Sequence, residues 1–199
     1  MLGAEGVSAG LAGHLTTLMP DRLATIRARL DVGAKSLPDL KRVYPEEVPF
    51  LGIESFPAAV VVMIGTDGRL TNRQADRGAS YEEHLYRYNV RIHLYAVDSS
   101  TMLASRQIKR LTLAVREALL SSKSVPVPEP DFATIDPQQL RESYGEIELR
   151  DRQFIAGSYV EIQVATQEIL ELALSFDGPA EISVDATATP PTWRHPEAD

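Results

Sequence analysis

Residues 82–123, EEHLYRYNVRIHLYAVDSSTMLASRQIKRLTLAVREALLSSK, contain a change of hydrophobic period that decides the fold. From Leu85 to Val97 apolar and polar side chains alternate, which is typical of a half-buried strand. Residues 98–101 then supply four side-chain oxygens in a row, as in the N-cap region of a helix. After them the apolar residues recur with helical spacing. The stretch therefore predicts a long strand that leads directly into a long amphipathic helix over about 99–121.

The polar face of the predicted strand carries Arg87, Arg91 and His93. At about 3.3 Å per residue the strand is roughly 40 Å long, which predicts a place in the middle of a sheet. The three polar side chains are candidates for a partner face or for the lining of a channel. The alternative is that the arginines pair with nearby carboxylates.

The predicted helix has apolar residues on two sides. One stripe, which includes Ile108 and Leu111, is expected to lie on the sheet. Met102, Leu113 and Leu120 fall together on the opposite side of a helical wheel. This second patch is either covered by another segment of the same chain or forms a subunit contact, and the sequence leaves both open.

The rest of the N-terminal half predicts one more helix and two strands. Leucines with helical spacing predict an N-terminal helix with a kink at Pro20, packed on the sheet. After a proline-rich passage, the apolar run 58–64 predicts a buried strand. Residues 65–68, Gly-Thr-Asp-Gly, predict a tight turn, from which residues 69–74 return as a hairpin partner.

The C-terminal part predicts further β-structure. Residues 121–130 predict a surface loop, and Asp136 with Pro137 predicts the start of a short helix. Residues 146–150 and 158–166 predict a hairpin with its turn at 151–157. The strand 169–176 would pair with 181–185, with a helix over 167–174 as the competing interpretation. We therefore expect an α+β protein with a mainly antiparallel sheet, a domain over 1–167, and a C-terminal β-hairpin and extended tail over 168–199. Trp193 in that tail is expected to dock on its own domain or on a neighbouring subunit.

Composition limits the chemistry. The 199 residues include no cysteine, which excludes disulfides, thiolate metal sites and cysteine nucleophiles, and the net charge of -8 opposes nonspecific binding to nucleic acid. No apolar run approaches the roughly 18 residues of a membrane span, and no histidine belongs to a metal-binding or catalytic motif. We expect no membrane contact, no cofactor, no metal and no enzymatic activity.

The order of elements adds a resemblance. An N-terminal helix, a proline-rich passage and an apolar strand precede the strand YRYNVRIHLYA (86–96), the long helix, and a closing strand that includes SYVEIQV (158–164). This arrangement over roughly residues 10–168 resembles the tail terminator proteins of long-tailed bacteriophages, which complete the tail and join it to the head. The proline-rich loop at 126–130 and the extension from about 168 depart from that family.

The resemblance implies a homo-hexameric ring that caps the head-proximal end of the tail tube. The implied partners are the tail tube protein and a head-closure or connector protein, and genomic DNA would pass through the ring without sequence-specific contacts. The implied location is the virion tail, after assembly in the host cytoplasm, and no catalytic residue carries over. The alternatives are another neck or head-tail connector ring protein, or a small α+β binding module that uses the polar strand face.

Overall fold

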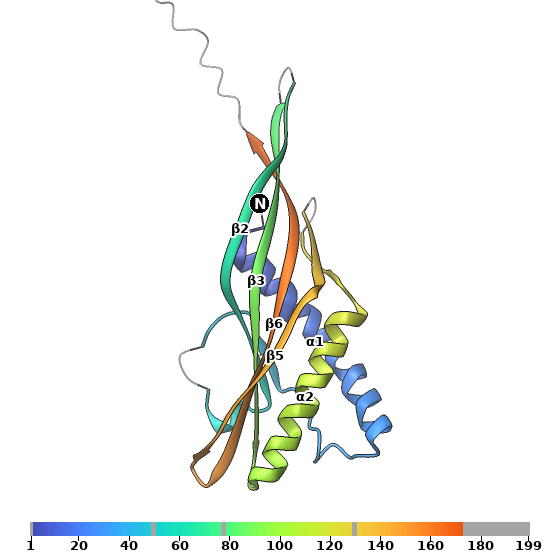
Figure 1. Ribbon diagram of the computed structural model, residues 1–199, viewed down its shortest axis with the longest axis vertical. Coiled ribbons are helices and arrows are strands. Elements are labelled where there is room, and N and C mark those ends of the chain that lie inside the picture. The colour runs from blue at the N-terminus through green and yellow to red at the C-terminus, as the bar shows by residue number, and fades with distance from the viewer. Residues whose placement is uncertain (1, 49–50, 77–78, 129–130, 173–199) are drawn as a thin grey trace, which may run out of the picture.

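Two helices pack on one face of a curled, mostly antiparallel sheet of six strands (Figure 1). The computed structural model describes residues 2–48, 51–76, 79–128 and 131–172. The sheet order is β1-β2-β3-β6-β5-β4, so the predicted α+β class is confirmed. The elements are α1 (Gly3–Leu30), β1 (Arg42–Tyr44), a 3-10 turn (Ile53–Ser55), β2 (Ala58–Asp76), β3 (Ala79–Asp98), α2 (Thr101–Ser121), β4 (Ser124–Val125), β5 (Phe132–Arg150) and β6 (Gln153–Leu172).

Strand β3 is the centre of the sheet. It pairs with β2 on one side and β6 on the other along nearly its whole length. Its 20 residues extend beyond the predicted 85–97 and correspond to about 65 Å. The predicted alternation is confirmed. From residue 88 to 96 every second side chain faces the helices and is buried, namely Tyr88, Val90, Ile92, Leu94 and Ala96.

The predicted turn at 65–68 is wrong. Strand β2 continues through these residues to Asp76, and Gly65 and Gly68 pair with Asn89 and Tyr86 of β3. A register shift between Met63 and Gly65 takes up the extra residue as an irregularity of the strand. Glycine-rich turn chemistry is a local preference, and pairing along the whole of β3 outweighs it.

Helix α2 confirms the expected helix, which begins two residues later than predicted. Ser100 is the N-cap residue, but its side chain makes no capping hydrogen bond. Instead the backbone N–H of Ser100 donates to Oδ1 of Asp98 at 3.1 Å, and Nε2 of Gln107 donates to Oδ2 of Asp98 at 2.9 Å. The inward stripe is buried as predicted, at Ala104, Ile108, Leu111, Val115, Ala118 and Leu119.

Helix α1 runs without interruption through Pro20. A proline inside a helix costs about 3 kcal/mol, and contacts with α2 and the sheet offset that cost. Nε2 of His14 lies 2.8 Å from the carbonyl oxygen of Ser122, and Arg29 forms an ion pair with Glu117 at 2.7 Å. A buried apolar row holds the helix in place, namely Val7, Leu11, Leu15, Met19, Leu23 and Ile26.

The predicted short helix at Asp136 is also wrong, because strand β5 passes through that position. Oδ1 of Asp136 accepts a hydrogen bond from the backbone N–H of Gln138 at 2.9 Å. This bond has the form of a helix cap, yet here it accompanies an irregularity in the pairing of β5 with β6 between Asp136 and Arg141. Pro137 fits there because it has no N–H to contribute to the ladder.

The second hairpin, β5 with β6, is confirmed with a shorter turn than expected. The strands reach Arg150 and Gln153, so the turn consists of Asp151 and Arg152, both with positive φ. The predicted surface loop at 121–130 includes the short strand β4, in which Val125 is buried.

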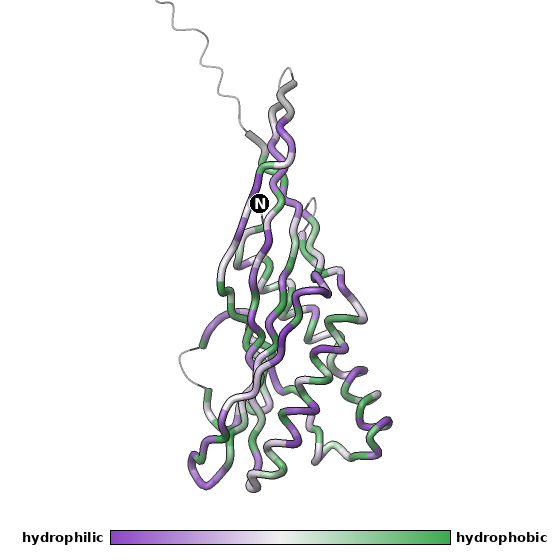
Figure 2. Tube along the Cα trace, viewed as in Figure 1, coloured by the Kyte–Doolittle hydropathy of each residue, from purple (hydrophilic) through white to green (hydrophobic). Residues whose placement is uncertain are grey.

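The sheet is longer than the helical layer. Strands β2, β3 and β6 continue past the start of α1 and form a narrow projection, here called the arm, consisting of residues 66–76, 79–87 and 165–172 (Figure 1). Figure 2 shows hydrophilic and hydrophobic residues alternating along these strands. Polar side chains also lie on both faces of the arm, since Arg87 and Asp67 are on one face and Glu82 and His84 are on the other.

Candidate functional site

The face of the sheet opposite the helices carries the predicted polar residues, but it does not present them as one free surface. Nη2 of Arg91 donates to Oε2 of Glu161 at 3.0 Å, and its guanidinium lies 4.3 Å from the ring centroid of Tyr159. The predicted alternative of carboxylate pairing therefore applies to Arg91. The ring of His93 packs against those of Tyr95 and Tyr159, with centroid distances of 6.4 and 5.7 Å.

The surroundings of His93 favour the neutral form of its imidazole. Burial, and secondarily the positive charge of Arg91, lower the pKa of its imidazole, and Glu47 opposes this shift. A cavity of about 260 Å³ lies beside it, lined by Glu47, Val48, Leu51, Val60, Val62, His93 and Tyr95. The lining combines aliphatic side chains with the polar groups of Glu47, His93 and Tyr95, and part of it comes from the segment that precedes β2.

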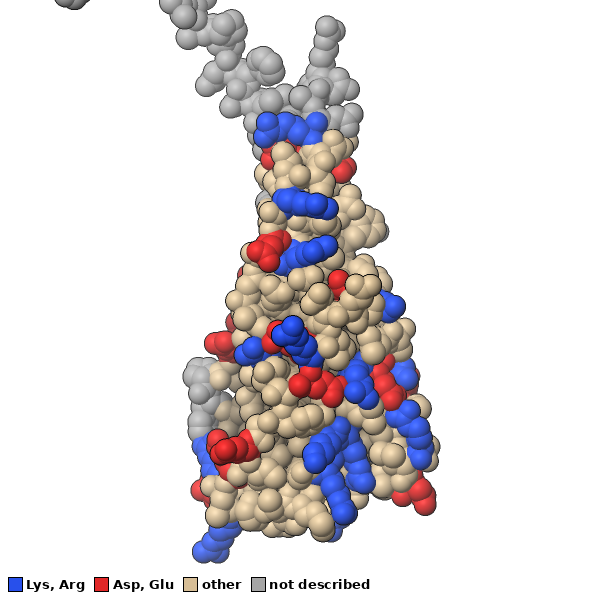
Figure 3. All heavy atoms as spheres, in the orientation of Figure 1, with Lys and Arg blue, Asp and Glu red and all other residues tan. Residues whose placement is uncertain are grey.

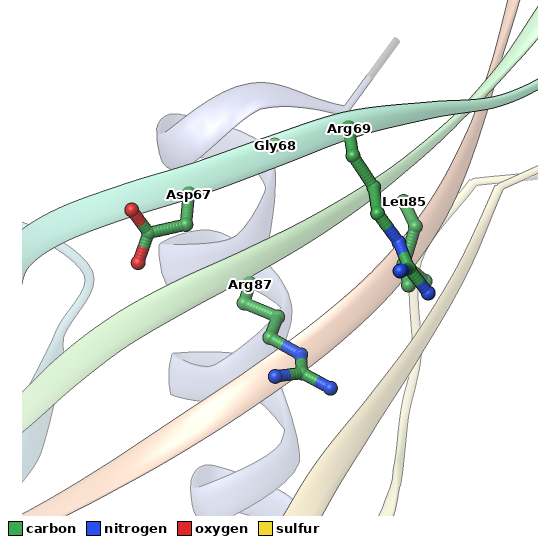
Figure 4. Close-up of a pocket in the computed structure, with 5 residues that line it drawn as sticks. All are labelled: Asp67, Gly68, Arg69, Leu85 and Arg87. Atoms are coloured by element: carbon green, nitrogen blue, oxygen red, sulfur yellow. The ribbon is translucent and has the colours of Figure 1, made fainter.

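Arg87 lies apart from the other two, on the arm. Its register partner on β2 is Asp67, but Figure 4 shows the Asp67 carboxylate pointing away from the Arg87 guanidinium. Arg69 projects from β2 on the same face, and its side chain and that of Arg87 run in the same direction across the sheet (Figure 4). Neither arginine has an ion pair or hydrogen-bond partner among the described residues. They line a hollow of about 200 Å³ together with Asp67, Gly68 and Leu85.

Sequence reasoning missed Arg69 because the false turn at 65–68 placed it on a separate strand. The register that brings Arg69 diagonal to Arg87 depends on the continuous β2–β3 hairpin. Figure 3 shows Lys and Arg side chains at intervals along the arm, on the face turned toward the viewer.

The predicted helix patch is divided in the structure. Met102 and Leu120 are exposed by 57% and 38%, whereas Leu113 is partly buried and packs against the core. The two exposed residues are 18 positions apart, or about 27 Å along the helix axis. A helical wheel gives the direction of a side chain but ignores this separation. Of the two alternatives for the patch, the core of the same chain accounts for Leu113 and leaves Met102 and Leu120 open.

Both outer long strands have open edges. Strand β1 pairs with β2 only at residues 58–60, and β4 pairs with β5 only at 133–134. Within the described residues, no strand pairs with the remaining outer edge of β2 or of β5. Large apolar side chains are exposed on both strands, namely Ile64, Leu70, Phe132, Tyr144 and Leu149. Long open edges of this kind are surfaces that native proteins usually cover or pair.

A buried carboxylate joins the two ends of the described chain. Glu168 is 1% exposed. Its Oε1 accepts from the Tyr88 phenol at 2.8 Å and from Thr166 Oγ1 at 2.9 Å, and its Oε2 accepts from the backbone N–H of Leu2 at 2.9 Å. The alternation of Val164, Thr166 and Glu168 on the inward face of the strand is the signal that could have identified it.

The described residues test only part of the predictions for the C-terminal region. Strand β6 continues without a break to Leu172, which supports the strand interpretation over a helix at 167–174. The hairpin turn at 177–178, the strand 181–185 and Trp193 lie outside the described residues.

Among the residues described, no group of three metal-ligating side chains converges, and no helix is long and apolar enough to cross a bilayer. No family model matches the chain, and no curated protein matches it.

Proposed function

We propose that the chain is a structural protein of a phage-type tail, a ring-forming tail terminator that caps the head-proximal end of the tail tube. The observation that supports this most is the pair of long open edges, β2 on one side of the sheet and β5 on the other. The order of helix, hairpin, long helix and closing hairpin agrees with the family resemblance.

Two different open edges favour head-to-tail association. When one surface of a protein binds a different surface of the next copy, the contact closes into a ring if the rotation allows it. Edge-to-edge pairing would continue the sheet from subunit to subunit and satisfy the backbone groups of both strands. The exposed Ile64 and Leu70 on β2, and Tyr144 and Leu149 on β5, would be covered in that contact.

The role we propose for this ring is mechanical. A homo-hexamer would bind the tube protein on one face and a head-closure or connector protein on the other. The net charge of -8 suits a channel that DNA passes through, because like charges reduce adhesion of DNA to the wall. In this account the protein belongs to the virion, has no cofactor and catalyses no reaction.

Solution mass and negative-stain images test the assembly step. The wild-type chain is expected to form rings of uniform size, and Ile64→Lys or Leu149→Lys is expected to leave folded monomers, because a lysine opposes edge pairing. Leu30→Lys, an equivalent change at a 41% exposed position of α1 and on neither edge strand, is the matched control for added charge. Rings that form equally well in both edge variants would contradict the proposed contact.

A further inference from the structure

The hollow between Arg69 and Arg87 has the chemistry of a site for an aromatic side chain flanked by acids. Its volume is about 200 Å³, compared with the roughly 30 Å³ that one water takes up in the liquid, so one large side chain fits. Leu85 adds an apolar surface, and Gly68 contributes backbone to the lining. Two guanidinium groups without partners among the described residues border it. Arginine stacks on aromatic faces, and tryptophan is the best partner for such a contact.

We propose that the C-terminal segment 173–199 of the same chain binds this site, with Trp193 between Arg69 and Arg87. Trp193 is the only tryptophan of the protein. The segment contains five carboxylates, at Asp177, Glu181, Asp185, Glu197 and Asp199, against one arginine, Arg194. Its acidic charge complements the two arginines, which have no ion-pair partner in the part of the chain that the structure describes, and two of the acids follow Trp193 closely.

The geometry of the chain puts this segment within reach. Leu172, the last described residue, pairs with Ser80 near the tip of the arm. Leu85 at the hollow pairs with Gln167, five positions back along β6, which is about 17 Å. The 21 residues from Leu172 to Trp193 have a root-mean-square span of about 25 Å as a flexible chain. The tether therefore matches the distance, and it holds the indole close to the site at a high effective concentration.

This assignment is independent of ring formation. It gives a partner to two arginines on neighbouring strands that project in one direction and pair with no carboxylate of the described residues, although Asp67 lies on the same face. Each exposed guanidinium adds a modest contact with the indole, and the short tether adds to both by keeping the indole near the site.

The fluorescence of Trp193 in the full chain tests the proposal directly. In the wild type we expect a blue-shifted emission and weak quenching by acrylamide, because the indole is sheltered. In the double variant Arg69→Ala, Arg87→Ala we expect emission at longer wavelength and severalfold stronger quenching, close to that of the chain in urea. Arg106→Ala, on the exposed face of α2, is the matched control and should leave both properties unchanged. Far-UV circular dichroism establishes that all three proteins are folded.

Two further measurements distinguish the proposed contact from a purely electrostatic one and from a contact between two molecules. The double variant Arg69→Lys, Arg87→Lys keeps the charge but loses the planar groups, so it should recover only part of the protection. Dilution of the wild type should leave the emission unchanged, since the contact lies within one molecule. A wild-type indole as accessible as in urea, full recovery by lysine, or protection that disappears on dilution would each overturn the assignment.

Discussion

The Tyr88 phenol donates a hydrogen bond of 2.8 Å to the buried carboxylate of Glu168. The two residues lie 80 positions apart, on the adjacent strands β3 and β6, and the other carboxylate oxygen accepts from the N–H of Leu2 at the start of α1. This one side chain thus attaches the beginning of the helical layer to the central sheet at the base of the arm. Four donors reach it in all, the fourth being the N–H of Gly3 at 3.4 Å.

Replacement of Glu168 by alanine should lower the free energy of unfolding by about 2 to 3 kcal/mol, because several buried donors lose their acceptor at once. Urea titration measures the effect, and Glu146→Ala, which removes an exposed carboxylate from β5, is the control with little expected change. If Glu168→Ala were as stable as the control, the carboxylate would have no such structural role.

The contact between Tyr88 and Glu168 also leads us to expect that the protein loses stability at alkaline pH. Burial, and then the hydrogen bond to Glu168, raise the pKa of the Tyr88 phenol above its ordinary value. The unfolded chain ionises this phenol at about pH 10 while the folded chain keeps its proton. Stability therefore falls as the pH rises above about 10. In Tyr88→Phe this part of the fall should be missing, while the stability at neutral pH drops by about 1 kcal/mol; parallel curves for both proteins would rule the mechanism out.

For His93 we expect the opposite dependence of stability on pH, with a loss of stability as the solution becomes acidic. Burial lowers the pKa of its imidazole below the ordinary value of about 6.5. Below that pH the unfolded chain takes up a proton that the folded chain resists, so the contribution is complete above about pH 6.5 and decreases as the pH falls. Thermal unfolding of wild type and His93→Gln between pH 7 and 5, in the same buffer series, measures the difference. An equal loss of stability in both proteins would assign it to other groups.

Two leucines of helix α2 should differ in their effects, because Leu120 is exposed and Leu113 packs against the core. Leu120→Asp, at a position 38% exposed, should change the unfolding free energy by no more than about 0.5 kcal/mol and weaken assembly if this end of the helix meets a neighbour. Leu113→Asp should destabilise the monomer by about 1 to 3 kcal/mol, because the new carboxylate would be placed against the core. Sedimentation velocity and urea titration on the same samples separate the two effects, and an unstable Leu120→Asp monomer would contradict this description of the helix.

The local sequence pattern was sufficient to predict the central strand β3 and the helix α2 that follows it. Alternation from Leu85 to Val97 and helical spacing after Thr101 are properties of adjacent residues, and the structure has both elements in place. The errors occurred where pairing over long distances competes with local chemistry. Gly65 and Asp136 carry turn and cap preferences, but each lies in a strand whose neighbour determines its conformation.

The candidate sites were less predictable for the same reason. Arg87, Arg91 and His93 share a strand face in the sequence, but the partners of Arg91 come from β6, whereas Arg87 has no ion-pair partner among the described residues. Glu168 receives its donors from three separate segments of the chain. A one-dimensional pattern contains neither relationship.

The capping of tail tubes tests the central proposal most directly. Negative-stain images would be recorded of tubes from the associated particle, mixed with the wild-type chain or with the Ile64→Lys variant. We predict ring-shaped density at one end of each tube with the wild type and bare ends with the variant, together with tubes that stop growing when the wild type is present. A wild-type chain that remains monomeric and leaves both tube ends bare would contradict the account.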